Sequence, residues 1–189
     1  MKIILSRKGV DSTSGGFASP IFEDGRMVSI PIPQDDSQTK YGDIQYAGTN
    51  LGRIVGLLSK GRYTEQDGAH CDPDINRDCL QRDPDWRPIF GQVGMSQGHL
   101  GVQGVSAGDV FLFFGWFRDA HGTPSEPGGY QRESAGYHVL WGWLQIGDVL
   151  NVDATDWSDM GWTSYHAHRQ YTPDRTNTLY VAAKDLSME

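Results

Sequence analysis

Long apolar runs and cysteines are both scarce in this sequence of 189 residues. No run approaches the roughly 20 apolar residues that a membrane-spanning helix needs, and no signal peptide precedes the first predicted strand. We therefore expect a cytoplasmic protein with no membrane partner. The two cysteines, Cys71 and Cys79, lie in one polar loop. Their spacing is compatible with a short disulfide, but the missing secretory signal favours two reduced thiols.

Positive charge is also in short supply. The chain has 24 Asp and Glu residues against 16 Lys and Arg, a net charge of −8. This balance argues against wide, non-specific attachment to a polyanion, although it allows a local basic groove. The length is typical of one domain that buries its own core, so residues 1–189 are expected to form a single domain.

The common nucleotide-binding fingerprints are missing too, because neither G-x-x-x-x-G-K-[S/T] nor G-x-G-x-x-G occurs. The chain has instead a polar segment, residues 6–20, directly after a short predicted strand at residues 2–5. Backbone amides at a Gly-rich turn, beside cations and hydroxyls, can bind an anion. We predict a phosphate or nucleotide site here, the plain alternative being a polar surface loop. The candidate residues are Ser6, Arg7, Lys8, Asp11, Ser14, Gly15 and Gly16.

Two aromatic segments, residues 108–117 and 137–144, form the centre of the predicted fold. Both are short and rich in β-branched and aromatic residues, which favours buried strands over helices. Gly115 and Gly142 interrupt them, and a glycine inside a strand marks a bulge, a bend or a close approach by another group. We expect an α+β domain, predominantly β, with few short helices and either a strongly bent mixed or antiparallel sheet or a small barrel.

The other segments give weaker signals. Asp24-Gly25 between apolar stretches predicts a hairpin, and the apolar spacing after Asn50 predicts a short helix that ends near residue 60. A last strand is expected at residues 177–183. Residues 61–98 are charged and broken by prolines, and loops of this length are usually functional or mobile. Whether a natural chain continues beyond Glu189 is left open.

Several polar and aromatic blocks follow one another along the chain. They are Ser6-Arg-Lys-Gly-x-Asp11, Ser14-Gly-Gly-x-x-Ser-Pro20, His70-x-Asp-Pro-Asp74, Phe90-Gly-Gln92, Gly108-Asp-x-Phe-Leu-Phe-Phe-Gly-Trp-Phe117, His138 with Gly142-Trp-Leu-Gln145, and Asn177-Thr-Leu-Tyr-Val-Ala182. In this order they resemble the family called nucleotide modification associated domain 3, over almost the entire chain. The resemblance implies a bacterial or phage protein that modifies or handles nucleobases, with a nucleotide or nucleic acid and other modification enzymes as its partners. It implies no catalytic residue.

A looser similarity covers only the two central segments. A Gly-Asp pair, an apolar strand, a loop and a second strand that contains glycine are similar to the core of PUA-like barrels, including the EVE, ASCH and YTH groups. That similarity implies a non-catalytic reader, in which aromatic residues stack on a modified, flipped base.

Histidine and aspartate spacing allows a metal site. His70 and Asp72, with His138 or His166 as a third ligand, would give the two-histidine, one-carboxylate set that suits non-haem iron, and zinc is the other candidate. However, an isolated His-x-Asp sequence is common by chance, and His70 lies in a loop before a proline. The sequence alone favours a site without a metal.

Acid–base catalysis needs no metal. Lys8, Asp11 and Ser14 are candidates to bind a phosphate and to place an acid or a base. His70, Asp72 and His138 are candidates for proton transfer, because the ordinary pKa of histidine lies close to neutral pH. Each also has a plain alternative as a turn former, a solvated charge or a core histidine.

Aromatic and basic residues complete the predicted site. The candidates for nucleotide binding include Trp116, Arg118, His166 and His168. On simple strand alternation, Trp141 and Trp143 share one face and His138 lies on the other. We expect an enzyme that modifies a nucleotide or nucleobase, with a reader of modified bases as the alternative and a structural interaction module third. The sequence predicts neither the reaction nor the oligomeric state.

Overall fold

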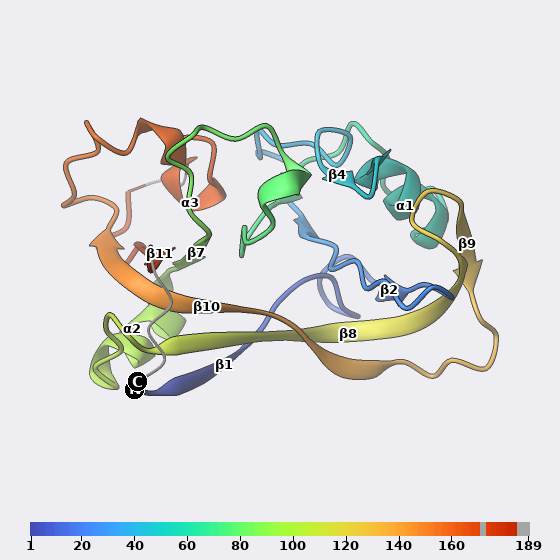
Figure 1. Ribbon diagram of the computed structural model, residues 1–189, viewed down its shortest axis with the longest axis horizontal. Coiled ribbons are helices and arrows are strands. Elements are labelled where there is room, and N and C mark those ends of the chain that lie inside the picture. The colour runs from blue at the N-terminus through green and yellow to red at the C-terminus, as the bar shows by residue number, and fades with distance from the viewer. Residues whose placement is uncertain (171–172, 185–189) are drawn as a thin grey trace.

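A computed structural model describes residues 1–170 and 173–184 of the chain (Figure 1). Its strands are β1 (Ile3–Arg7), β2 (Ser19–Ile21), β3 (Ile32–Pro33), β4 (Gln45–Tyr46), β5 (Thr49–Asn50), β6 (Ala69–His70), β7 (Ile89–Gln92), β8 (Val110–Gly122), β9 (Pro127–Tyr130), β10 (Tyr137–Asn151) and β11 (Thr178–Ala182). Its helices are α1 (Leu51–Leu58), α2 (Gly94–Val102) and α3 (Ala167–Gln170), with short 3₁₀ turns at Arg77–Cys79 and Gly161–Thr163. No described helix is long and apolar enough to span a bilayer.

One mixed sheet of seven strands organises the domain. Five of them follow the order β1-β8-β10-β11-β7, and β2 and β9 each pair with β8 beside this path. The long strands β8 and β10 are antiparallel, while β1 and β2 both run parallel to β8 at different points along it. Figure 1 shows β8 and β10 as long twisted ribbons, with most of the short elements on one side of them. The described sheets do not close on themselves. The prediction of a predominantly β domain with a bent, mixed sheet is therefore confirmed, in its open form.

The two glycines of the central strands act as expected. At Gly142, opposite Phe113, the register between β8 and β10 shifts, and a Cβ would lie 2.4 Å from Cδ1 of Ile75. At Gly115 a Cβ would lie 2.7 Å from the carbonyl oxygen of Lys8. At Gly115 the obstacle is backbone, so no larger residue fits, whereas at Gly142 the side chain of Ile75 would have to move. Gly115 allows the end of β1 to pass close over β8, which places Lys8 above the sheet.

Two expectations about the strand faces are wrong, and the bulge before Gly142 explains the first of them. Trp141 packs against Phe113 on the inner face, whereas Trp143 is 49% exposed, so the two tryptophans do not share a face. Leu140 and Leu5 are also exposed. The prediction of two fully buried strands is thus right for the inner face only, because no described helix or strand packs over the outer one (Figure 1).

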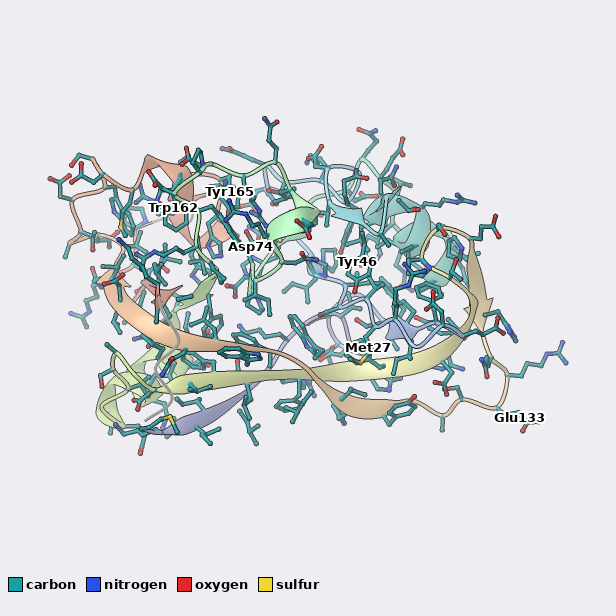
Figure 2. All side chains as sticks on the ribbon, viewed as in Figure 1. Met27, Tyr46, Asp74, Glu133, Trp162 and Tyr165 are labelled. Atoms are coloured by element: carbon teal, nitrogen blue, oxygen red, sulfur yellow. The ribbon has the colours of Figure 1, made fainter. Side chains whose placement is uncertain are left out.

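Short elements between residues 22 and 88 form most of the layer over the inner face (Figure 1). Helix α1 begins where expected, because the side chain of Asn50 caps it by accepting from the backbone amide of Arg53. The Asp24-Gly25 turn also forms, although residues 26–31 are irregular rather than a strand. Tyr46 donates to the carbonyl of Met27 at 2.6 Å, and Figure 2 shows these two residues between the layer and the sheet. The final strand is confirmed as β11, between β10 and β7.

The aromatic core under this layer should contribute strongly to the stability of the fold. Phe113 is fully buried, with ring contacts to Phe90, Phe111 and Trp141. We expect Phe113→Ala to lower the free energy of unfolding by about 3–5 kcal/mol, since it leaves a cavity. Chemical denaturation measures this, with Met95→Ala, at a position 95% exposed, as the control. A loss below about 1 kcal/mol would contradict this account of the core.

Candidate functional site

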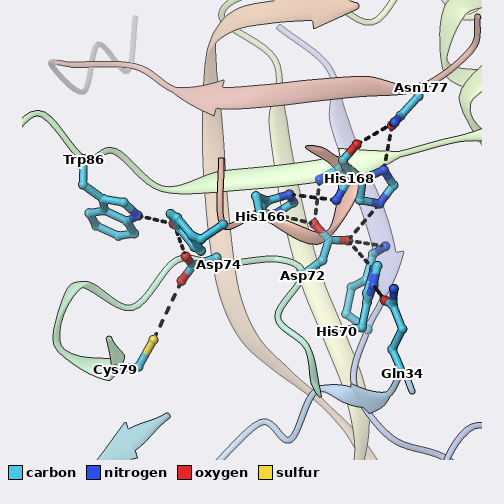
Figure 3. Close-up of polar contacts among 12 residues, drawn as sticks. Gln34, His70, Asp72, Asp74, Cys79, Trp86, His166, His168 and Asn177 are labelled. Atoms are coloured by element: carbon cyan, nitrogen blue, oxygen red, sulfur yellow. Dashed lines mark hydrogen bonds and ion pairs between the residues drawn. The ribbon is translucent and has the colours of Figure 1, made fainter. Parts of the chain in front are cut away.

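Asp72 is the centre of a buried polar cluster (Figure 3). Its side chain is 0% exposed. Oδ1 accepts from the backbone amide of Gly91 at 2.6 Å. Nε2 of His166 lies 3.5 Å from the same oxygen. Because Nδ1 of His166 accepts from the backbone amide of His168, its Nε2 carries the proton and points a donor at Oδ1.

The other carboxylate oxygen of Asp72 faces three side chains. Nζ of Lys8 lies 3.3 Å from Oδ2, and Nε2 of His70 and of His168 lie 3.8 and 3.9 Å from it. The ammonium group of Lys8 also lies 4.4 Å from the centre of the Phe90 ring. A buried carboxylate needs compensation by positive charge or hydrogen bonds, and here five groups from distant parts of the chain surround it.

Backbone geometry brings these groups together. Lys8 follows β1, His70 ends β6 and Gly91 lies in β7, while His168 is in α3, which packs on β7. Gly91 is essential to this packing, because a Cβ there would lie 2.1 Å from Cδ2 of His168.

Two side-chain amides fix the ring tautomers of His70 and His168. Nδ2 of Asn177 donates to the carbonyl of His168 at 2.7 Å, so its Oδ1 must accept from Nδ1 of that ring, at 2.8 Å. Nε2 of Gln34 likewise donates to a carboxylate oxygen of Asp36, at 2.8 Å, and its Oε1 faces Nδ1 of His70. Both rings therefore carry their proton on Nδ1, and Nε2 is the atom turned toward Asp72.

Electrostatics keep Asp72 ionised. Burial alone would raise the pKa of Asp72, but Lys8 and the neighbouring histidines hold it well below its ordinary value. Burial lowers the pKa of His168 to about 4, despite the favourable charge of Asp72. At neutral pH His168 is thus an uncharged base beside a carboxylate.

A second buried carboxylate, Asp74, lies two residues further along (Figure 3). The guanidinium of Arg82 donates to both of its oxygens, at 2.5 and 2.7 Å, and the hydroxyl of Tyr165 donates to Oδ2 at 2.5 Å. Trp86 donates in turn to that hydroxyl at 2.7 Å. Asp74 is therefore a buried, hydrogen-bonded charge and not a solvated one. Its charge is fully compensated by these partners.

Both cysteines are free, as the sequence predicted, but they are buried next to Asp74 rather than in an exposed loop. Nη2 of Arg82 lies 3.1 Å from Sγ of Cys79. Hydrogen bonding to Cys79, followed by burial, raises the pKa of Cys71 well above its ordinary value. Cys71 is accordingly protonated and unreactive at neutral pH.

Most of the N-terminal segment forms a self-contained turn. Oδ1 of Asp11 accepts from the backbone amides of Thr13 and Ser14, at 2.8 and 2.7 Å, and Arg7 pairs with its other oxygen. Burial, the largest influence, would raise the pKa of Asp11, but these hydrogen bonds and Arg7 lower it. The geometry supports the plain turn-forming role of Asp11 and Ser14, and leaves Lys8 as the residue of this segment that reaches Asp72.

Among the described residues, one groove and two pockets lie next to the Asp72 cluster and the N-terminal segment. An open groove of about 580 Å³ has Lys8 in its wall, a pocket of about 300 Å³ touches residues 71–77, and a third of about 320 Å³ adjoins the Gly15-Gly16 turn. The groove is lined by Ile4, Leu5, Ser6, Arg7, Lys8, Gln92, Met95, Ser96, His99, Leu100 and Phe111. The third pocket includes Gly15, Gly16, Lys60, Arg62, Trp116, Arg118 and Tyr130. Of the predicted nucleotide-binding residues, Trp116 and Arg118 thus lie at the third pocket with Gly15 and Gly16, and Ser6 and Arg7 lie at the groove with Lys8.

Comparison with known protein families gives one match. The family model described as nucleotide modification associated domain 3 matches residues 2–188. The chain belongs to this family. Comparisons with curated proteins and with solved structures give no match.

Some of the predicted site residues lie close together in the structure, and others do not. His70 and Asp72 meet Lys8 and both C-terminal histidines, His166 and His168. His138 is exposed on the outer face, where its ring contacts Phe114, so it does not join the buried cluster.

Sequence reasoning missed the two amides that orient the histidines and the partners of Asp74. The sequence signal for His168 is its spacing from His166, and that spacing alone predicts nucleotide binding and not a place beside Asp72. Nothing in the local sequence pairs Gln34 or Asn177 with a ring, since these contacts join distant segments.

Breaking the buried pair of Asp74 and Arg82 should be costly. We expect Arg82→Met to lower the free energy of unfolding by about 3–5 kcal/mol, because it leaves a buried carboxylate without its main counter-charge. Urea denaturation measures this. Arg26→Met, which removes an exposed partner of Asp24, is the control and should leave the midpoint unchanged. Equal effects of the two substitutions would contradict the assignment.

Proposed function

We propose that this protein is an enzyme that modifies a nucleotide or nucleobase, with Lys8, His70, Asp72 and His168 as its reacting centre. One observation carries the proposal: a fully buried carboxylate faces two oriented imidazoles and an ammonium group. Such strongly perturbed, mutually oriented groups cluster at functional sites. Membership of the nucleotide modification associated family supplies the substrate class.

The chemistry follows from the charge state of each group. Nε2 of His168 is a neutral base that can accept a proton from a substrate. Lys8 is a cation that stabilises negative charge as it develops on a base oxygen or a leaving group. Asp72 holds Lys8 in place through Oδ2, and its charge favours the protonated form of His168 after proton transfer. Asp11 and Ser14 support the turn that follows Lys8, and we assign them no proton transfer.

We place the reacting part of the substrate in the groove beside Lys8. Its volume, about 580 Å³, lies within the usual range for small-molecule sites. Lys8 is 16% exposed and belongs both to the groove wall and to the Asp72 cluster, so it links the two.

The basic pocket at the Gly15-Gly16 turn is our candidate for a phosphate contact. Lys60, Arg62 and Arg118 line it, with no carboxylate among its lining residues. Because the groove and this pocket share no lining residue, a polynucleotide, whose phosphates repeat along the strand, fits both better than a free nucleotide does.

A reader of modified bases is the second candidate function. Trp116 and Tyr130 in the same basic pocket favour it, since aromatic rings beside cations suit stacked bases. A reader would bind modified DNA saturably without changing it, which separates it from the enzyme.

Mass spectrometry of nucleosides tests the proposal. DNA and RNA from cells that express the wild-type protein should contain a new nucleoside, and Lys8→Met should reduce its amount by about 100-fold or more, as loss of an acid–base group does. His168→Gln should do the same. His121→Ala, an exposed histidine paired with Glu23, should leave the yield unchanged. Near-ultraviolet circular dichroism verifies that each variant is folded.

A full yield of the new nucleoside from folded Lys8→Met and His168→Gln would contradict the assignment of the reacting centre. Saturable binding of modified DNA by a wild-type protein that makes no new nucleoside would favour the reader.

A further inference from the structure

We infer that His70, Asp72 and His168 bind one divalent transition-metal ion, through Nε2, Oδ2 and Nε2 respectively. The inference deepens the proposed function, because it names a ligand for the same site, and it rests on that function only for the use made of the metal. It gives Nε2 of His168 a different role, since a nitrogen that binds the ion cannot also accept a proton from the substrate. Metal binding itself is a property of these three side chains.

The three ligand atoms converge. They all lie within 4.8 Å of one another, and the two Nε2 atoms lie 3.8 and 3.9 Å from Oδ2. These separations are too long for hydrogen bonds. Ligands at about 2.0–2.2 Å from a shared metal would be about 3.0–3.5 Å apart, so a small inward movement of the side chains completes the site.

The surrounding groups orient all three ligands as metal sites require. Metal-binding histidines usually donate the proton of their other ring nitrogen to a carbonyl or carboxylate oxygen. Here Asn177 accepts from Nδ1 of His168 at 2.8 Å, and Gln34 faces Nδ1 of His70. The backbone amide of Gly91 holds Oδ1 of Asp72, which turns Oδ2 toward the rings. Each ligand therefore presents its electron-pair donor to the same point.

Lys8 provides the positive charge in the metal-free geometry. Its ammonium group lies 3.3 Å from Oδ2, and a metal ion at the shared point would compete with it for that oxygen. Since Lys8 also lines the open groove, its flexible side chain has room to withdraw. The group of Cys71, Asp74 and Cys79 also has metal-ligand spacing, but Arg82 and Tyr165 already occupy both oxygens of Asp74.

The donor set indicates the class of ion. Two imidazoles and one carboxylate, with no thiolate, suit iron(II), zinc, cobalt(II) or manganese(II) rather than copper(I) or magnesium. Three protein ligands leave further positions for water or substrate, the arrangement of catalytic rather than structural metal sites.

Titration of the full, metal-free chain with zinc and, separately, with cobalt(II) tests the inference. The wild-type protein should bind one equivalent of each, and cobalt should give the visible absorption of a protein-bound ion. His168→Gln and Asp72→Asn should weaken binding by about 100-fold or more, while His121→Ala, at an exposed histidine, should keep it.

Two further variants separate a metal site from an ion pair. Asn177→Ala removes the amide that accepts from Nδ1 of His168 and keeps all three ligands, so in a folded variant it should weaken binding about tenfold. Lys8→Met removes the competing charge, so metal affinity should be maintained or rise. No stoichiometric binding by folded wild-type protein, or equal binding by folded His168→Gln, would overturn the inference.

The two proposals fail separately, because the titration contains no substrate. A protein that binds no metal yet produces a new nucleoside would overturn the metal site and keep the proposed function. A protein that binds one equivalent of metal and produces no new nucleoside would keep the metal site and overturn the proposed function.

Discussion

The burial of one carboxylate, that of Asp72, is the constraint on which the site depends. An ionised carboxylate with no exposed surface requires donors or cations on every side, and the fold supplies them from β1, β7 and the segment around α3. The sheet explains how this is achieved. Gly115 lets the end of β1 pass close over β8, and Gly91 leaves room for His168 against β7.

Two neighbouring carboxylates show how surroundings set the role of the same side chain. Both oxygens of Asp74 accept hydrogen bonds from the guanidinium of Arg82 and the hydroxyl of Tyr165. This residue therefore has a structural role. Asp72 has its Oδ1 held by Gly91, while its Oδ2 faces two rings at distances too long for hydrogen bonds. Of the two, only Asp72 has an oxygen that is not saturated by hydrogen bonds, and our proposed function therefore centres on Asp72.

Local patterns in the sequence predicted the local features. The central strands, the start of α1 at Asn50 and the special places of Gly115 and Gly142 were all visible, because each depends on neighbouring residues. The face on which Trp143 lies was not, since the bulge before Gly142 shifts the alternation by one residue. The family was also recognisable from its ordered blocks, which the match over residues 2–188 confirms.

The candidate site was predictable only in part. His70-x-Asp72 was identified by spacing, and Lys8 by its place after a strand, but their meeting depends on contacts between segments about 60 residues apart. The sequence suggests His138 as a third ligand because it lies on a core strand, but strand periodicity alone does not say which side of an open sheet is covered. The histidine that lies beside Asp72 is His168, because Asn177 and Gly91 fix it against β7.

The tautomers of the three buried histidines test this account most directly. Nitrogen-15 NMR of ring-labelled, metal-free protein, with resonances assigned by substitution, distinguishes the two ring nitrogens at neutral pH. The account predicts a proton on Nδ1 of His70 and His168 and on Nε2 of His166. Protons on Nε2 of both His70 and His168 would contradict it, because those atoms would then donate to Asp72 and could not bind a metal.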